Sequence, residues 1–183
     1  MLRDATDREQ LKKIHFLYEE TFPKSEKKPF WYMLKKRKKG FFDLLEIRDE
    51  DGNFCGLAIM MLSNGLALLD YLAISPEHRG CGVGSMALRE LRERYGGERI
   101  VIEIESTVGA AAKSAENAEE RLRRKEFYLR NGLAPMDFQV KLFGVEMEVL
   151  TYGRKLTFEQ YFSIYENVLP GRLAKKVRLV CAD

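Results

Sequence analysis

The chain has 183 residues, of which 45% are hydrophobic and 32% are charged, and its formal net charge is +3 at pH 7. This length and composition are typical of one soluble globular domain, and folding should bury about 70% of the surface that the unfolded chain exposes. No apolar run approaches the roughly 20 residues of a membrane span, and the polar N-terminus predicts no signal peptide. The small net charge indicates no particular class of partner.

Three cysteines, Cys55, Cys81 and Cys181, are scattered along the chain. They form no CxxC pair, and their spacing matches no common arrangement of metal ligands. We therefore expect free thiols in a reducing cytoplasm and no bound metal.

The first half of the chain predicts two helices followed by an antiparallel meander. The first helix should begin after Thr6 or Asp7, either of which is a good N-cap, and end at Phe22-Pro23. A second, short helix is expected over residues 30–39, ended by Gly40. Three strands should follow, joined by the hairpin signals Asp51-Gly52 and Asn64-Gly65, at residues 41–49, 53–63 and 66–74.

The second half predicts alternating helices and strands. A helix from Ser85 presents Leu88, Leu91 and Tyr95 on one face and should end at Gly96-Gly97. The later elements are a strand at 99–105, a loop at 106–114, a charged helix at 115–131, strands at 138–142 and 145–152, and a helix from a Thr157/Gln160 capping box to about Val168. This order predicts an α+β fold, with helices packed on a mixed, mostly antiparallel sheet.

The sequence HRGCGVG, residues 78–84, follows the last strand of the meander and leads directly into a helix. Such a strand, glycine loop and helix N-terminus together favour anion binding, because the backbone N–H groups and the helix dipole both attract negative charge. A nucleoside-triphosphate loop would require a lysine before Ser85, and a dinucleotide fold would require GxGxxG after a parallel strand; neither is present. Taken alone, a tight glycine turn without a ligand remains the alternative.

The wider stretch LAISPEHRGCGVG resembles the pyrophosphate-loop motif [RQ]-x-x-G-x-[GA] of the GNAT acetyltransferase superfamily, with Arg79, Gly82 and Gly84 on the motif positions. EFYLRNGL, residues 126–133, resembles the end of that family's next helix, where a tyrosine is followed four residues later by glycine and an apolar residue. The strand IVIEIE between them stands where the family has its fifth strand. The resemblance covers residues 43–152 in element order and is specific over 66–133.

The resemblance implies a GNAT-like central sheet with helices on both faces and a V-shaped opening between the fourth and fifth strands. It implies a single acetyltransferase domain over residues 1–183. Within it, we expect acceptor-side helices at 1–40, the sheet and CoA-binding core at 41–152, and a C-terminal extension at 153–183.

Acetyl-CoA is the cofactor that the resemblance implies. Loop amides from about residue 81 to 85 would bind the pyrophosphate, and the strand end at 72–74 would hydrogen-bond the pantetheine arm as an added strand. The family often has an asparagine seven residues before its tyrosine, but Arg121 stands there in this chain. The predicted cofactor-binding residues are Leu72, Ala73, Ile74, Arg79, Gly80, Cys81, Gly82, Val83, Gly84, Ser85, Asn117, Arg121 and Tyr128. His78 stands where the family commonly has an aromatic residue, and no role is assigned to it.

Acetyl transfer to an amine requires a base for the ammonium proton and an acid for the leaving thiolate. Tyr128, in the family motif, is the predicted acid. Glu103 and Glu105, which strand alternation places on one face, and Asp70 are the candidate bases. We select Glu103, because VIEIE resembles the LEV of ribosomal-protein N-terminal acetyltransferases, whose glutamate acts as base. Mutual repulsion should raise the pKa of one of the two glutamates.

The resulting prediction is a cytoplasmic N-acetyltransferase that transfers acetyl from acetyl-CoA to a primary amine of a small molecule or peptide, with a homodimer as one compatible state. One alternative is a CoA-binding regulatory or sensor protein without catalysis. A second is a nucleic-acid-binding module built on the basic run at 34–40, but this run lacks interleaved aromatic residues and the net charge is small. We therefore expect neither a nucleic-acid nor a membrane partner.

Overall fold

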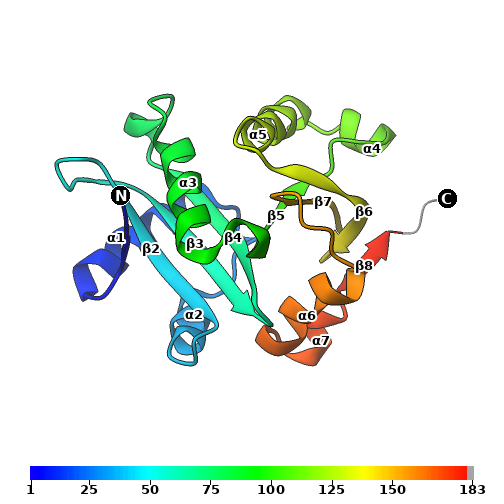
Figure 1. Ribbon diagram of the computed structural model, residues 1–183, viewed down its shortest axis with the longest axis horizontal. Coiled ribbons are helices and arrows are strands. Elements are labelled where there is room, and N and C mark those ends of the chain that lie inside the picture. The colour runs from blue at the N-terminus through cyan, green and yellow to red at the C-terminus, as the bar shows by residue number, and fades with distance from the viewer. Residues whose placement is uncertain (181–183) are drawn as a thin grey trace. The chain divides into compact units, whose positions relative to one another are not determined.

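The computed structural model describes residues 1–180 of the chain, without the side chains of residues 110 and 111. By its internal contacts the chain divides into two compact units (Figure 1). The first comprises residues 1–62 and 69–96, and the second comprises 63–68 and the chain from 97 onward. Cys181, one of the three predicted free thiols, lies outside the described residues.

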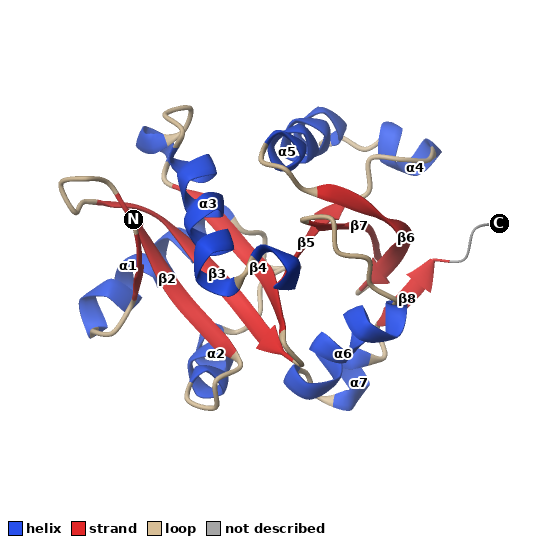
Figure 2. Cartoon of the chain, in the orientation of Figure 1, coloured by secondary structure: helices blue, strands red, loops and turns tan. Residues whose placement is uncertain are grey.

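The first unit holds the strand order β1-β2-β3-β4, in which β2 pairs antiparallel with both β1 and β3. Helix α3 lies over one face of these strands, and α1 and α2 lie over the other (Figure 2). Because both faces are covered, seven consecutive residues of β3 are buried. The elements are β1 (Leu2–Asp4), α1 (Arg8–Thr21), α2 (Phe30–Arg37), β2 (Phe42–Arg48), β3 (Phe54–Ser63), β4 (Leu66–Ile74), the 3₁₀ helix η1 (Pro76–His78) and α3 (Val83–Tyr95).

The second unit holds the strand order β5-β7-β6-β8, with every neighbouring pair antiparallel. The first residues of β4, at 66–68, also belong to this unit. The elements are η2 (Gly97–Arg99), β5 (Ile100–Glu105), α4 (Ala110–Lys113), α5 (Ala118–Arg130), β6 (Ala134–Leu142), β7 (Val145–Thr151), α6 (Phe158–Val168), α7 (Gly171–Ala174) and β8 (Val177–Val180).

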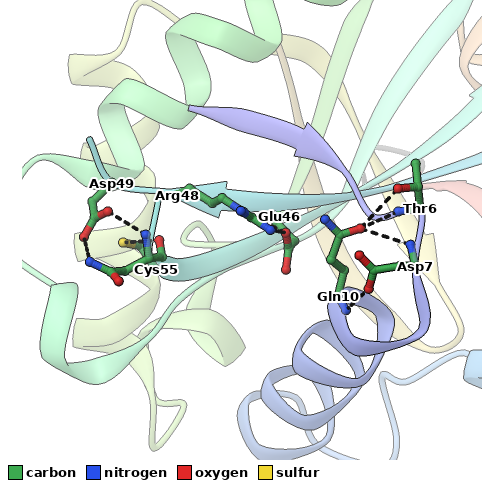
Figure 3. Close-up of polar contacts among 8 residues, drawn as sticks. Thr6, Asp7, Gln10, Glu46, Arg48, Asp49 and Cys55 are labelled. Carbon is green, nitrogen blue, oxygen red and sulfur yellow. Dashed lines mark hydrogen bonds and ion pairs between the residues drawn. The ribbon is translucent and has the colours of Figure 1, made fainter. Parts of the chain in front are cut away.

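The predicted fold class, an α+β arrangement with a mostly antiparallel sheet, is confirmed. The predicted V-shaped opening between the fourth and fifth strands and the predicted single domain over 1–183 stay predictions. Two of the predicted helix starts, at Asp7 and Thr157, are confirmed in detail. Asp7 caps α1 by accepting a hydrogen bond from the Gln10 backbone amide at 2.9 Å, and the Gln10 side-chain oxygen accepts one from the Asp7 amide at 3.1 Å (Figure 3). Thr157 and Gln160 form the same capping box at α6.

Five local features of the structure differ from the predictions. The short strand β1 was not expected, because three residues are too few to show the alternation of apolar and polar residues that predicts a strand. It forms by pairing with β2, with Leu2 opposite Ile47. The predicted loop at 106–114 contains α4, and the charged helix begins at Ala118 rather than at 115. Strand β6 begins at Ala134 rather than at 138. Its pairing with β7 shifts register between Pro135 and Gln139, which interrupts the alternation of apolar and polar residues along the strand. The segment after α6 contributes β8, which pairs with β6.

Candidate functional site

The glycine loop between η1 and α3 has a backbone that only glycine adopts easily. Gly80 and Gly82 have φ angles of +79° and +80°, in the left-handed region. Gly82 is the N-cap of α3, and no side chain caps this helix. A Cβ built on Gly80 or Gly82 would have no other atom within 4 Å. The first backbone amides of α3 are therefore not capped by a side chain. The loop next to them leaves open space where a ligand could approach.

Helix α3 is held on the sheet by a small apolar cluster. Its residues Val83, Met86 and Ala87 pack against Ile47 of β2 and Cys55 of β3. Leu72 and Ile74, at the end of β4, pack against the same cluster. This packing fixes the N-terminus of α3 relative to the strand end that precedes the loop.

Arg79, the first residue of the predicted pyrophosphate motif, closes the turn before the loop. Its Nε donates to the carbonyl oxygen of Ile74 at 2.9 Å, and its backbone N–H donates to that of Pro76 at 3.3 Å. Cys81, two residues later, is exposed. The structure thus gives Arg79 a local role in shaping the loop, while its predicted contact with the cofactor stays a prediction.

Tyr128 lies in the last turn of α5, and the helix end explains the motif around it. The amide of Leu133 donates to the Tyr128 carbonyl at 3.2 Å, and the amide of Gly132 donates to the Leu129 carbonyl at 3.0 Å. Gly132 has a φ of +86°. These two bonds and a left-handed glycine form a Schellman motif, so the spacing from tyrosine to glycine is set by the helix end.

The Tyr128 side chain is only 7% exposed, and burial raises the pKa of its hydroxyl to about 12. Within the described residues, this hydroxyl makes no hydrogen bond to another side chain or backbone group. Tyr128 is therefore a protonated phenol at neutral pH. Its hydroxyl donates a hydrogen bond to none of the described residues.

Glu103, the predicted base, lies on β5 next to β7. Its Oε1 accepts hydrogen bonds from the Tyr161 and Tyr165 hydroxyls, each at 2.5 Å. Both tyrosines belong to α6 and are fully buried. Neither tyrosine was among the predicted site residues, although their spacing of four residues on one helix face could have indicated a shared partner.

Glu105, two residues later, belongs to an ion-pair cluster with α5. Its carboxylate lies 2.7 Å from Arg121 and 3.5 Å from Arg124, and it accepts a hydrogen bond from Asn117 Nδ2 at 3.2 Å. Arg121 Nε also donates to Asn117 Oδ1 at 2.7 Å. Arg121, which replaces the family's usual asparagine, is therefore held by acidic and amide partners. These cations offset the charge of Glu105 and weaken its predicted repulsion from Glu103.

Asp70, the third carboxylate, lies on β4 and forms an ion pair with Lys28 at 2.7 Å. Its other oxygen, Oδ2, is buried and has no hydrogen-bond partner among the described residues. The backbone amide of Lys28 donates to the Tyr71 hydroxyl at 3.0 Å, which fixes the lysine beside the strand.

Glu148 of β7 forms a polar cluster that sequence reasoning did not find. It lies 2.6 Å from Lys125 of α5 and accepts hydrogen bonds from the amide and hydroxyl of Thr107 at 2.8 and 2.7 Å. Burial acts to raise the pKa of Glu148, but the Lys125 and Thr107 interactions outweigh it and lower that pKa below its ordinary value. The cluster ties α5 to β7 and to the segment after β5.

Lys125→Met should lower the free energy of unfolding by about 3 kcal/mol, because it leaves the buried Glu148 carboxylate without its cation. A lowered carboxyl pKa stabilises the fold above the unfolded-state value of about 4.5, and this stabilisation is lost as the pH falls below it. The difference from wild type in urea unfolding should therefore shrink below that pH. Lys155→Met, which breaks a highly exposed pair with Asp137, is the control and should change little. An equal effect of both variants would contradict the proposed importance of the Glu148 cluster.

The model of the acetyltransferase (GNAT) family matches residues 10–129. This range includes α1 except its first two residues, α2, α3, the glycine loop, Glu103, Glu105 and all of α5 except its last residue. No curated protein matches the chain.

Three solved structures with a similar fold carry acetyltransferase names. A Bacteroides thetaiotaomicron protein assigned to the GNAT family superposes with a TM-score of 0.73 at 21% identity, covering 95% of this chain and 98% of that one. An aminoglycoside 6′-N-acetyltransferase in complex with coenzyme A gives 0.63 at 11% identity, covering 86% and 99%. A Vibrio cholerae spermidine N-acetyltransferase in complex with CoA and spermine gives 0.58 at 15%, covering 82% and 92%. At these identities the likeness establishes the fold. Among the described residues, no helix is both long and apolar enough to cross a membrane.

Proposed function

This chain belongs to the GNAT acetyltransferase family, and from that premise we propose that it is an N-acetyltransferase that uses acetyl-CoA and acts on a primary amine. The observation that carries the proposal is the glycine loop, whose left-handed Gly80 and Gly82 lead into the uncapped N-terminus of α3. An amine acceptor is consistent with the aminoglycoside and spermidine enzymes that share the fold.

The residues of the loop fit a pyrophosphate. The first turn of α3 offers backbone N–H groups and the positive end of the helix dipole, and no side chain of the loop caps them. In this proposal the amides of residues 81–85 hold the pyrophosphate, and the end of β4 at 72–74 binds the pantetheine arm through its backbone. Bound acetyl-CoA would supply an acetyl group activated as a thioester.

Two side chains have proposed roles in proton transfer. Tyr128 keeps its proton at neutral pH, because its pKa is raised to about 12, and would donate that proton to the leaving sulfur. Glu103 would accept a proton from the incoming ammonium group. Glu105 and Asp70 are each already held in ion pairs with cations.

Catalysis can be tested directly by following thiol release from acetyl-CoA with a panel of polyamines, aminoglycosides, amino acids and peptide N-termini. We expect amine-dependent release with at least one class, together with CoA binding in calorimetry. CoA binding without release for any amine would instead favour the sensor alternative. Retention on DNA at physiological salt would favour the nucleic-acid alternative.

Gly84→Val should weaken acetyl-CoA binding more than tenfold, or about 1.4 kcal/mol, while the protein stays folded. The reason is steric, since a branched side chain in the first turn of α3 would stand where the pyrophosphate approaches the backbone. Gly171→Val is a matched control, because Gly171 also lies in the first turn of a helix and an added Cβ there meets no atom within 4 Å. Unchanged CoA affinity in folded Gly84→Val, measured by calorimetry, would refute the cofactor assignment.

A further inference from the structure

Three potential metal ligands from separate segments meet in the first unit. Asp49 follows β2, Cys55 lies on β3, and His78 ends η1. Each offers one ligand atom, and these three atoms all lie within 4.8 Å of one another. Figure 3 shows the Asp49 and Cys55 side chains next to each other at the end of the β2–β3 hairpin. An oxygen, a sulfur and a nitrogen at this separation form a donor set that suits zinc.

The hydrogen bonds of His78 leave one ring nitrogen suited to a metal. His78 Nδ1 lies 2.8 Å from the Ser75 hydroxyl, and this hydroxyl donates its single proton to the carbonyl oxygen of Cys55 at 3.1 Å. In the tautomer that carries a proton on Nδ1, Ser75 accepts from Nδ1–H of His78. The neutral ring then carries its lone pair on Nε2. Metal-binding histidines are commonly oriented in this way by a hydrogen bond from their other nitrogen.

The Asp49 carboxylate is also oriented while keeping acceptor capacity. Its Oδ1 accepts from the Asn53 amide at 2.7 Å, and its Oδ2 accepts from Asn53 Nδ2 at 2.9 Å. Each carboxylate oxygen has a second lone pair, so these bonds do not exhaust its capacity to bind a cation. The Asp49 amide donates to the Asn53 carbonyl at 3.1 Å, which closes the turn and fixes the aspartate backbone.

We propose that Asp49, Cys55 and His78 bind one Zn²⁺ ion per chain. As the Zn–S bond forms, the Cys55 thiol releases its proton to solvent, and no oxidation or reduction takes place. Three protein ligands leave a fourth position of the tetrahedral shell for water. The sequence spacing did not suggest this site, because the ligands are 6 and 23 residues apart and meet only through the hairpin and the turn into η1.

The bound ion would cross-link η1 to the β2–β3 hairpin. Since η1 leads directly into Arg79 and the glycine loop, zinc should stabilise the first unit at the base of that loop. We therefore expect the Tm to rise with added Zn²⁺, because the ion binds the folded chain and not the unfolded chain, in which the three ligands are far apart.

Binding can be measured with Co²⁺, which replaces Zn²⁺ and gives a charge-transfer absorption band when a thiolate binds it. The full chain carrying Cys81→Ser and Cys181→Ser retains Cys55 as its one thiol. We expect a saturable band at one Co²⁺ per chain, displaced by Zn²⁺. It should disappear in Cys55→Ser and its apparent Kd should rise at least tenfold in His78→Ala and Asp49→Asn. Asp51→Asn, an exposed aspartate of the same hairpin, is the control and should bind normally.

Several results would overturn the proposal. One is the absence of a saturable band, and another is a band that persists in Cys55→Ser. A third is unchanged affinity in His78→Ala, which keeps the test decisive even if replacing buried Cys55 prevents folding, because the His78 side chain is 29% exposed. The Zn²⁺-dependent rise in Tm should likewise be absent from folded His78→Ala, and its persistence there would count against the site.

Discussion

Tyr128→Phe is expected to lower kcat about 100-fold while leaving acetyl-CoA affinity nearly unchanged. Phenylalanine keeps the ring in its buried position at the end of α5 and removes only the proton that the leaving thiolate would receive. The expected size lies within the range for general acid–base catalysis. The measurement is steady-state kcat with a saturating amine, combined with calorimetry for acetyl-CoA.

The pH dependence separates proton donation from a structural effect. A thiol like that of CoA has a pKa near 8.5, so thiolate leaves more easily unaided as the pH rises, and the loss in Tyr128→Phe should shrink above that value. The Tyr128 hydroxyl, with a pKa of about 12, stays protonated over this range. Tyr95→Phe is the matched control, since it also removes the hydroxyl of a buried helical tyrosine, one that donates to Asp43 at 2.6 Å. An unchanged kcat in Tyr128→Phe at neutral pH would contradict its role as the acid.

Glu103→Gln is expected to lower kcat/KM about 100-fold and to remove the acidic limb of its pH profile. Glutamine keeps an oxygen that can accept from Tyr161 and Tyr165, but it cannot take up the proton of an incoming ammonium group. Asp70→Asn should retain both the wild-type kcat/KM and the acidic limb of its pH profile. Glu105→Gln should have an intermediate effect, because it removes a negative charge close to Glu103. Wild-type rates in Glu103→Gln together with inactive Asp70→Asn would move the base to Asp70, without changing the fold or the cofactor.

A second control addresses the contact between Glu103 and α6. If Glu103 acted only by holding this helix, then replacing both Tyr161 and Tyr165 with phenylalanine would reproduce the loss in kcat/KM. If Glu103 accepts the proton, the variant with both tyrosines replaced should keep the acidic limb of the pH profile, although the midpoint of that limb can shift. Loss of the limb in Glu103→Gln alone would therefore identify the carboxylate as the group that titrates.

Most of the element order and the two helix caps could be predicted because their signals are local. The capping boxes at Asp7 and Thr157 depend on residues three positions apart, and both form as expected. The Asn64-Gly65 turn has both residues at positive φ, as its sequence predicts. The family motif could also be placed, since the glycine loop and the Schellman end of α5 are each determined within a few residues.

The site was less predictable where it depends on contacts between distant residues. Glu103 could be placed on its strand, but not its hydrogen bonds to tyrosines 58 and 62 residues away. Likewise, Arg121 could be recognised as a departure from the family pattern, while its pairing with Glu105 depends on how α5 packs against β5.

The sequence by itself therefore determined most of the order of helices and strands, the place of the glycine loop and the position of Tyr128 in its helix end, because backbone sterics and capping act over a few residues. Only the tertiary structure decided which partners each carboxylate has and that Asp49, Cys55 and His78 meet. Those arrangements depend on strand register and helix packing, which bring together side chains that no local pattern relates.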